Sequence, residues 1–525
     1  MIENSVIPQY ALLKITKRQE QFVVSNGDIN KLITTEKEFL EFLNQIGPQV
    51  VELSANIPLS LEIFGNLTKL KYHLKVMNNG DLKKIADTVQ YLENLDVSAF
   101  NFEKDANLCV KVETIEQLLR FVKLKNLRLD MHHLGLRINF NDFQKLVTQL
   151  PMEVLDLNCS ILFEAGDNIE EVRERNTCLP LTKLHINTIE NHCQTFKLLN
   201  TFKNLHELKI KFIGEEHVTE DVLKEFSHCF ENVTHLTMKY TRFKEIHNFA
   251  VPPNITTLHL SYCRGLTFDN LQQLWEETPQ LIEFTSKGIS YNMMDDGQVL
   301  KISPLIESLS IENLDKNLLR VSTTNTPTAL RHVTLHLINP YKYIFGRRHR
   351  SPSPPPATPL TLDNLLQFKN LKKLSFVVEL PDQWLYVLGA LQQLPLLREL
   401  SLRVDGSSAS QLPHPFATNI TQLNVCYRCT SHDCANFWLG MFTNNPEMSL
   451  NMGIFLHEDE ILRNLVELEK FPQDLQTIMI AGFKVDCAQL RNNFEETLKT
   501  FKYNFEEFEV DDLDRLDYNI VLSRK

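Results

Sequence analysis

The sequence predicts an α/β solenoid, and two observations support this prediction. First, the pattern L-x-x-L-x-L recurs along nearly the whole chain, as in Leu205–Ile210, Val233–Met238 and Ile255–Leu260. Each copy alternates apolar and polar residues, which is typical of a short strand with one buried face. Second, the copies from Leu208 to Val333 follow one another at intervals of 22 to 28 residues. Such a period indicates a stack of repeats rather than one compact core.

The motif and its period are those of the leucine-rich repeat. Further copies begin at Val50, Leu67, Leu92, Leu124, Met152, Leu181, Ile306, Leu371, Leu397, Ile420 and Leu475, and residues 498–503 are expected to form the last strand. The predicted fold is therefore a curved leucine-rich-repeat solenoid with parallel strands on the concave face and helices on the convex face. A chain of 525 residues exceeds the size of about 250–300 residues at which single cores stop growing. A solenoid avoids that limit because each repeat packs only on its neighbours.

Between the strands, the apolar period changes to that of a helix. Thr219 is expected to cap a helix over residues 220–230, because its hydroxyl can accept hydrogen bonds from the free amides of the first turn. Leu223, Phe226 and Phe230 would line the buried face of this helix. The next repeat has Phe268, Leu271 and Leu274 at a similar spacing. Each repeat is therefore predicted to be one strand followed by one helix.

We expect five segments along the chain. Residues 1–45 form an N-terminal cap with a helix that begins after Thr35, and residues 46–338 and 360–505 are repeats. Residues 339–359 form a basic, proline-rich insertion that is expected to be disordered. Residues 506–525 form an acidic tail that could cover the last repeat.

The insertion contains two candidate regulatory residues. Ser351 and Ser353 each precede a proline and follow the basic run from Arg347 to Arg350. This pattern suits proline-directed kinases, and each phosphate would add about −1.5 to −2 charges. The alternative is an unmodified, solvated loop.

Composition narrows the class of protein. The net charge of −12 argues against a protein whose whole surface binds nucleic acid. We find no run of about 18 uncharged apolar residues, so no membrane span is expected. The first ten residues do not read as a signal peptide. The ten cysteines are therefore expected to be reduced thiols of a cytoplasmic or nuclear protein.

The sequence contains none of the four common motifs sought for nucleotide binding, serine hydrolysis or zinc-dependent proteolysis, so we expect no catalytic residues and no cofactor. The densest group of metal-type ligands is Cys426, Cys429, His432 and Cys434. A zinc site needs four such donors around one point, and this spacing matches no standard zinc motif. We therefore expect no metal site, and a metal-dependent enzyme is the most distant alternative.

The polar positions of the strands define a candidate binding surface. In L-x-x-L-x-L strands these positions face the concave side, because successive side chains alternate. In four central strands they include four lysines against the single acid Glu207, a net charge of +3. The predicted basic face consists of Lys183, His185, Lys209, Lys211, His235, Lys239 and His259. It predicts a protein partner with acidic or phosphorylated residues. The alternative is a generic polar surface that keeps the strands soluble.

Two stretches resemble the leucine-rich repeats of F-box proteins: the repeat Ile255–Cys263, which has a single Cys at its turn, and the segment Glu38–Leu53. In that family, the F-box binds the adaptor of an SCF-type ubiquitin ligase and the repeats hold the substrate. The chain shows no recognisable F-box. The segment closest to its opening pattern, Ile57–Phe64, lies between two repeat strands and is expected to belong to the solenoid.

The sequence thus favours a non-catalytic protein-recognition scaffold over an enzyme. The resemblance implies a substrate receptor with a ligase adaptor as a further partner. The alternative is a freestanding repeat protein that binds and masks one protein partner, as ribonuclease-inhibitor-like proteins do.

Overall fold

A computed structural model describes most of residues 12–287 and, beyond them, chiefly the strands. The ranges outside the described residues are 1–11, 19–20, 27–28, 74–76, 98–107, 130–135, 165–166, 168, 170–178, 189–191, 213–216, 245, 288–301, 304, 315–328, 338–367, 379–392, 406–420, 429–448, 456–476, 483–500, 505–517 and 525. The chain forms two compact units. Unit 1 comprises residues 1–257 and 262–264, and unit 2 comprises residues 258–261 and 265–525.

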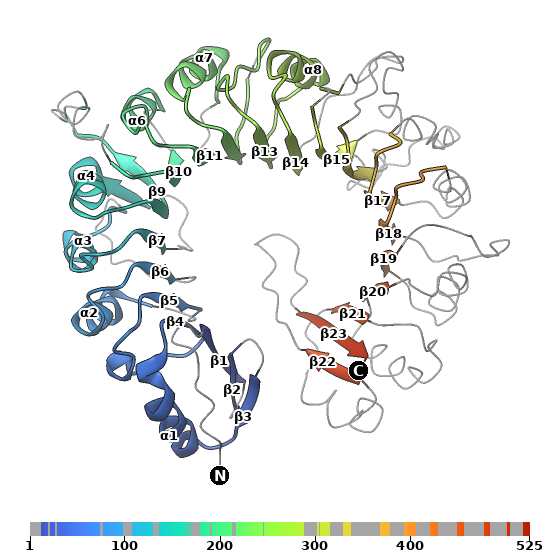
Figure 1. Ribbon diagram of the computed structural model, residues 1–525. Helices are drawn as coiled ribbons and strands as arrows, with labels where there is room; N and C mark the ends of the chain where they lie inside the picture. Colours follow the sequence, from blue (N-terminus) through green and yellow to red (C-terminus); the bar gives the residue numbers. More distant parts are fainter. Residues whose placement is uncertain are drawn as a thin grey trace, which may run out of the picture. The chain divides into compact units, whose positions relative to one another are not determined.

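Unit 1 is a leucine-rich-repeat solenoid in which parallel strands line the inner side of an arc and helices line its outer side (Figure 1). Its consecutive strands are β4 (Glu52–Ala55), β5 (Lys69–Tyr72), β6 (Asn94–Val97), β7 (Asn126–Leu129), β9 (Val154–Leu162), β10 (Lys183–Thr188), β11 (Glu207–Phe212) and β12 (His235–Lys239). Their registers align the second leucine of every repeat, from Leu53 to Leu236, in one row. Each leucine in this row is at most 3% exposed. The predicted phase of the repeat is therefore confirmed.

A recurring set of hydrogen bonds joins each repeat to the one before it. The backbone amides of Thr234 and His235 both donate to the carbonyl of His206, at 2.9 and 3.0 Å. In the turn before the next strand, Asn254 Nδ2 donates to the carbonyl of Glu231 at 2.7 Å. Backbone amides and carbonyls next to the short strands thus form hydrogen bonds with the neighbouring repeat.

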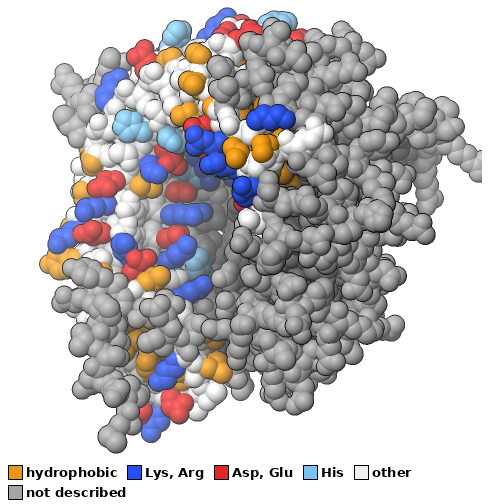
Figure 2. Space-filling model, turned by 45° about the vertical axis from the view of Figure 1, so that its right-hand side comes forward, with side chains coloured by type: hydrophobic (Ala, Val, Ile, Leu, Met, Phe, Trp, Pro, Cys, Tyr) orange, Lys and Arg blue, Asp and Glu red, His pale blue; other side chains and the backbone are white. Residues whose placement is uncertain are grey.

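The strands alternate buried and outward-facing side chains, as period-two segments should. The outward positions carry many charges, and Figure 2 shows lysines and arginines next to aspartates and glutamates in rows over this surface. Cross-strand ion pairs link the rows, for example Lys71 with Asp96 at 3.6 Å and Lys69 with Glu52 at 3.2 Å. The face opposite the helices is therefore densely charged.

The helices of unit 1 pack their apolar faces against one another and against the backs of the strands. They are α2 (Asn79–Thr88), α3 (Val112–Leu119), α4 (Phe140–Gln149), α6 (His192–Leu199) and α7 (Glu220–Cys229). Phe196 of α6 meets Phe226 of α7 edge-on, with ring centroids 5.1 Å apart. Both rings are at most 1% exposed, so aromatic contacts join successive repeats.

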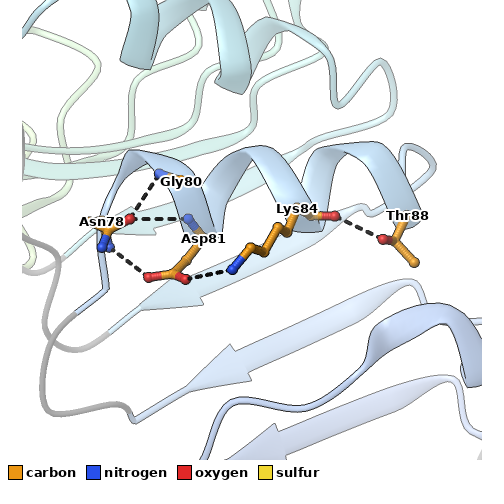
Figure 3. Close-up of polar contacts among 5 residues, drawn as sticks. All are labelled: Asn78, Gly80, Asp81, Lys84 and Thr88. Carbon is orange, nitrogen blue, oxygen red and sulfur yellow. Dashed lines mark hydrogen bonds and ion pairs between the residues drawn. The ribbon is translucent and has the colours of Figure 1, made fainter.

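Helix α2 shows how local sequence sets a helix start (Figure 3). Asn78 Oδ1 accepts hydrogen bonds from the amides of Gly80 and Asp81 at 2.8 and 3.2 Å. Asp81 Oδ2 in turn accepts from the amide of Asn78 at 3.2 Å, which completes a capping box. Lys84 pairs with Asp81 at 3.8 Å, and Thr88 Oγ1 donates to the Lys84 carbonyl at 2.8 Å.

Helix α7 begins where the sequence predicted and Thr219 is its N-cap residue, but the expected hydrogen bond to the Thr219 hydroxyl is absent. The neighbouring Glu220 forms polar contacts at this helix start: it pairs with Lys224 at 2.9 Å and accepts from the amides of His247 and Asn248. Leu223, Phe226 and Phe230 are buried as expected.

The N-terminal segment adds antiparallel strands to the edge of the solenoid. β1 (Leu12–Arg18) pairs in parallel with β4 and antiparallel with β2 (Gln21–Asn26), which pairs with β3 (Ile29–Ile33). The expected helix is present as α1 (Glu36–Ile46), with Thr35 as its cap. Short elements follow at η1 (Gly47–Gln49) and η2 (Leu61–Ile63), and β8 (Arg137–Asn139) pairs beside β9.

Unit 2 is built from the same kind of repeat. It contains β13 (Thr257–Ser261, all but Thr257), α8 (Phe268–Glu277), β14 (Glu283–Lys287), β15 (Ser308–Leu314), β16 (His332–Leu337), β17 (Lys373–Val378), β18 (Glu399–Asp405), β19 (Gln422–Arg428), β20 (Ser449–Phe455) and β21 (Thr477–Gly482). Strands β14 to β21 pair in parallel, each with the next. Leu271 and Leu274 of α8 are buried as predicted, and Thr267 caps this helix.

The predicted insertion lies between two strands that are direct neighbours. Val333 of β16 pairs in register with Leu374 of β17, although they are separated by 41 residues in the sequence. Residues 339–359 themselves lie outside the described residues. The ladder is therefore continuous without them.

Two strands at the C-terminal end differ from the prediction. β20 was missed, because its apolar pattern departs from the repeat motif, yet Leu450 lies in register with Leu423. β22 (Phe501–Asn504) is not the last strand, since the chain returns as β23 (Tyr518–Arg524). β23 pairs antiparallel with both β21 and β22.

Candidate functional site

Six of the seven residues of the predicted basic face lie in unit 1, on three consecutive strands. We call Lys183 and His185 of β10, Lys209 and Lys211 of β11, and His235 and Lys239 of β12 the basic strand face. The registers place Lys183 beside Glu207, His185 beside Lys209, and Lys211 beside Lys239. His259 belongs to unit 2, where its Nε2 lies 3.2 Å from Glu283 Oε1.

The lysines of this face are not equally accessible. Lys183 is exposed, whereas Lys209, Lys211 and Lys239 are half-buried. Neighbouring strands lie close together, and a lysine side chain at such a position can bury its aliphatic stem against its neighbours. Its ammonium group can still reach solvent from such a position.

Glu207 and Asp156 reduce the positive charge at one end of the face. Lys183 Nζ pairs with Glu207 Oε2 at 2.6 Å, and His185 Nδ1 lies 2.5 Å from Asp156 Oδ1 on β9. Asp156 also pairs with Arg128 of β7 at 3.6 Å. The cation-rich part is therefore the region of β11 and β12 that holds Lys209, Lys211 and Lys239.

His185 and Asp156 influence each other's protonation. Burial lowers the pKa of His185 and outweighs the nearby carboxylate, which raises it. Burial alone would raise the pKa of Asp156, but its hydrogen bond to His185 and the charges of Lys209 and Arg128 hold it below the usual value. His185 is therefore neutral at neutral pH, with its Nδ1 next to a carboxylate oxygen. It therefore adds no positive charge to the face at neutral pH.

Two tyrosines that the repeat pattern did not predict complete the surface. Tyr240 directly follows β12, and its ring stacks on that of Tyr262 with centroids 5.2 Å apart and an interplanar angle of 12°. Lys211 Nζ lies 4.9 Å from the centroid of the Tyr240 ring. The available signal was positional, because both tyrosines stand two residues after the last apolar residue of their repeat motifs. Asp156 could also have been found, since it alternates with Leu155 and Leu157.

The other candidate sites fall largely outside the described residues. Ser351, Ser353, Cys429, His432 and Cys434 are not described, and of Cys426 only the backbone, within β19, is described. Within the described part of the chain, no group of three or more His, Cys, Asp or Glu residues could hold a metal ion. Cys109, Cys159 and Cys263 are buried, and none of these three forms a disulfide. Among the described helices, none combines the length and apolar character that crossing a membrane requires.

No protein-family model and no curated protein sequence matches the chain. Among solved structures, it is similar to the TLR13 chain of a TLR13–ssRNA13 complex, with 14% sequence identity and a TM-score of 0.40. The matched region covers 78% of this chain and 63% of that one, so the chain spans less than two thirds of the length of this neighbour. At this level no functional conclusion follows, and the strand registers themselves define a leucine-rich-repeat solenoid.

Proposed function

We propose that the chain is a non-catalytic protein-recognition scaffold that binds an acidic or phosphorylated partner through the basic strand face. The observation that supports this most is the clustering of Lys209, Lys211 and Lys239 on two adjacent strands. In a protein of net charge −12, such a cluster attracts an oppositely charged partner locally. Stacked strands also offer a broad surface to which a partner can bind.

Two assemblies suit such a scaffold in the cytoplasm or nucleus. One is a substrate receptor that also binds an SCF-type ligase adaptor, as the resemblance to F-box proteins suggests. The other is a freestanding protein that masks one partner. The burial of Leu61 and Phe64 supports the second, because these two residues of the F-box-like stretch Ile57–Phe64 pack within the repeats.

The partner should first be captured by affinity purification of the full chain and identified by mass spectrometry. Recovery of a ligase adaptor would support the receptor, whereas one stoichiometric partner without an adaptor would support the freestanding scaffold. Metal analysis of the purified protein tests the remaining alternative, a metal-dependent enzyme that uses the Cys426 cluster.

The basic strand face is tested by replacing Lys183, Lys209, Lys211 and Lys239 with Ser. Binding of the captured partner should become slower, and its salt dependence flatter, because exposed charges are screened within about 8–10 Å at physiological salt. A matched control replaces Lys37, Lys83, Lys84 and Lys203, which are exposed outside the strands. It removes the same charge and should change association much less. Equal affinities and equal salt slopes for both variants would place the site elsewhere.

A further inference from the structure

Tyr240 and Tyr262 adopt a backbone conformation that is costly for their residue type. Their φ angles are 56° and 54°, in the left-handed region that favours glycine and asparagine. Such a conformation is strained for a residue that carries a Cβ atom. Two successive repeats nevertheless place a tyrosine at the corresponding position. The turn alone does not explain this choice, because asparagine or glycine would form it at lower cost.

Backbone hydrogen bonds join the two turns that carry the tyrosine rings. The carbonyl of Thr241 accepts a hydrogen bond from the amide of Arg264, and the carbonyl of Arg264 accepts one from the amide of Phe243, both at 2.8 Å. Thr241 and Cys263, the residues that follow the tyrosines, are fully buried. The rings themselves are not: Tyr240 is 36% exposed and Tyr262 is half-buried. A rigid base thus presents a partly exposed aromatic pair.

Positive charge lies beside this aromatic pair. Lys211 Nζ is 4.9 Å from the Tyr240 ring centroid, and Lys239 is the residue before Tyr240. Lys209 precedes Lys211 by two residues on the same face of β11. Arg242 and Arg264 follow the tyrosines by two residues, and both are exposed. Tyrosine and arginine are enriched among the residues that dominate binding energy at protein interfaces.

We propose that the partner binds through an acidic peptide segment, an inference that rests on the proposed function. The anchor site for this segment consists of Tyr240, Tyr262, Lys209, Lys211 and Lys239. An aromatic or proline side chain of that segment packs on the exposed edges of the two rings. Carboxylates next to it pair with the lysine ammonium groups. We call these five residues the tyrosine–lysine anchor.

The surrounding charges favour an acidic peptide over a nucleic acid. From β5 to β9, the outward row reads Lys71, Asp96, Arg128 and Asp156, so its charge alternates in sign. The phosphate backbone of a nucleic acid that extended across these strands would be repelled by the carboxylates of Asp96 and Asp156. A peptide can place its few acids over β11 and β12 and be neutral or basic beyond them. The short extent of the cationic region therefore suits a peptide.

The test uses the full chain and short fluorescent peptides rich in Asp and Glu around a central Pro-Tyr pair. The wild-type chain should bind this probe at least about tenfold more tightly than the same peptide with Ala in place of Pro-Tyr. The Tyr240→Asn/Tyr262→Asn variant should lose this preference, whereas Tyr240→Phe/Tyr262→Phe should keep most of it. A peptide with Lys in place of its acids should not bind.

Stability separates the anchor from a structural role for the rings. Asparagine tolerates the left-handed conformation, so the double Asn variant should melt at or above the wild-type temperature while it loses the probe. If the double variant loses both stability and binding, the tyrosine stack has a structural role and the proposal is overturned. The single Tyr262→Asn variant, which removes only one ring, provides a second test of the same kind. Tighter binding of single-stranded oligouridine than of the acidic peptide would also overturn it.

The captured partner distinguishes this proposal from the broader one. If the quadruple lysine variant loses the partner but the double Asn variant keeps it, the basic strand face stands and the tyrosine–lysine anchor fails. If both variants keep the partner, both proposals fail.

Discussion

Lys183 Nζ lies 2.6 Å from Glu207 Oε2, so the first lysine of the basic strand face is already paired with a carboxylate on the next strand. Both side chains are about half exposed, and such exposed pairs contribute little to stability. Their importance here is for the surface charge, because the pair is neutral as a unit. The net positive charge of the face therefore comes from β11 and β12.

A first prediction follows for partner binding. Replacing both Lys183 and Glu207 with Ser preserves net charge and should leave the association rate within about twofold of the wild type. Replacing both Lys211 and Lys239 removes two positive charges and no negative one, and should slow association by about two- to tenfold at low salt. Stopped-flow measurements of both double variants would check this. A greater loss in the Lys183/Glu207 variant would place the contact on β10.

The second prediction concerns the insertion at residues 339–359. Its deletion should leave the thermal unfolding temperature nearly unchanged, because β16 and β17 already pair in register across it. Limited proteolysis of the intact chain should cut first within this segment. A protected segment, or a deletion variant that melts much earlier, would mean that it packs on the solenoid.

The third prediction concerns the buried row of the repeat. Leu258 is fully buried, so Leu258→Asp should lower the free energy of unfolding by several kcal/mol. The matched control is Thr257→Asp, which introduces the same charge one residue earlier at a half-buried, outward-facing position. Denaturant unfolding of both variants compares the two faces directly. Equal losses would contradict the assigned phase.

The fourth prediction concerns pH. The folded-state pKa of His185 lies below its unfolded value, so the unfolded chain binds more protons as pH falls below about 6.5. Stability should therefore be independent of His185 above that pH and decline below it. The lowered pKa of Asp156 adds a further loss at lower pH, as this carboxylate becomes protonated. The free energy of unfolding of the His185→Gln variant should decline less between pH 6.5 and 5 than that of the wild type. Denaturant unfolding at each pH would show this difference. If the stability of both proteins depends on pH in the same way, the pKa of His185 is the same in the folded and the unfolded chain.

Much of the fold was readable from the sequence because its determinants are local. The alternation around Leu208 and Leu236 identifies which side chains are buried, and the structure aligns these two residues in register. The start of α7 at Glu220 was also predictable, since its apolar residues recur at helical spacing. Where the motif weakens, as at Leu450, the sequence did not predict a strand that the ladder nevertheless includes.

The sequence by itself determined the repeat, its phase and the list of outward-facing residues on most strands. Only the tertiary structure decided which of these residues meet. Asp156 and His185 stand 29 positions apart, and they pair because stacking brings β9 and β10 into register. Tyr240 and Tyr262 stack because consecutive turns are joined by backbone hydrogen bonds at positive φ. The periodicity within a repeat does not predict these two contacts, because each contact joins side chains of two neighbouring repeats and depends on how those repeats stack.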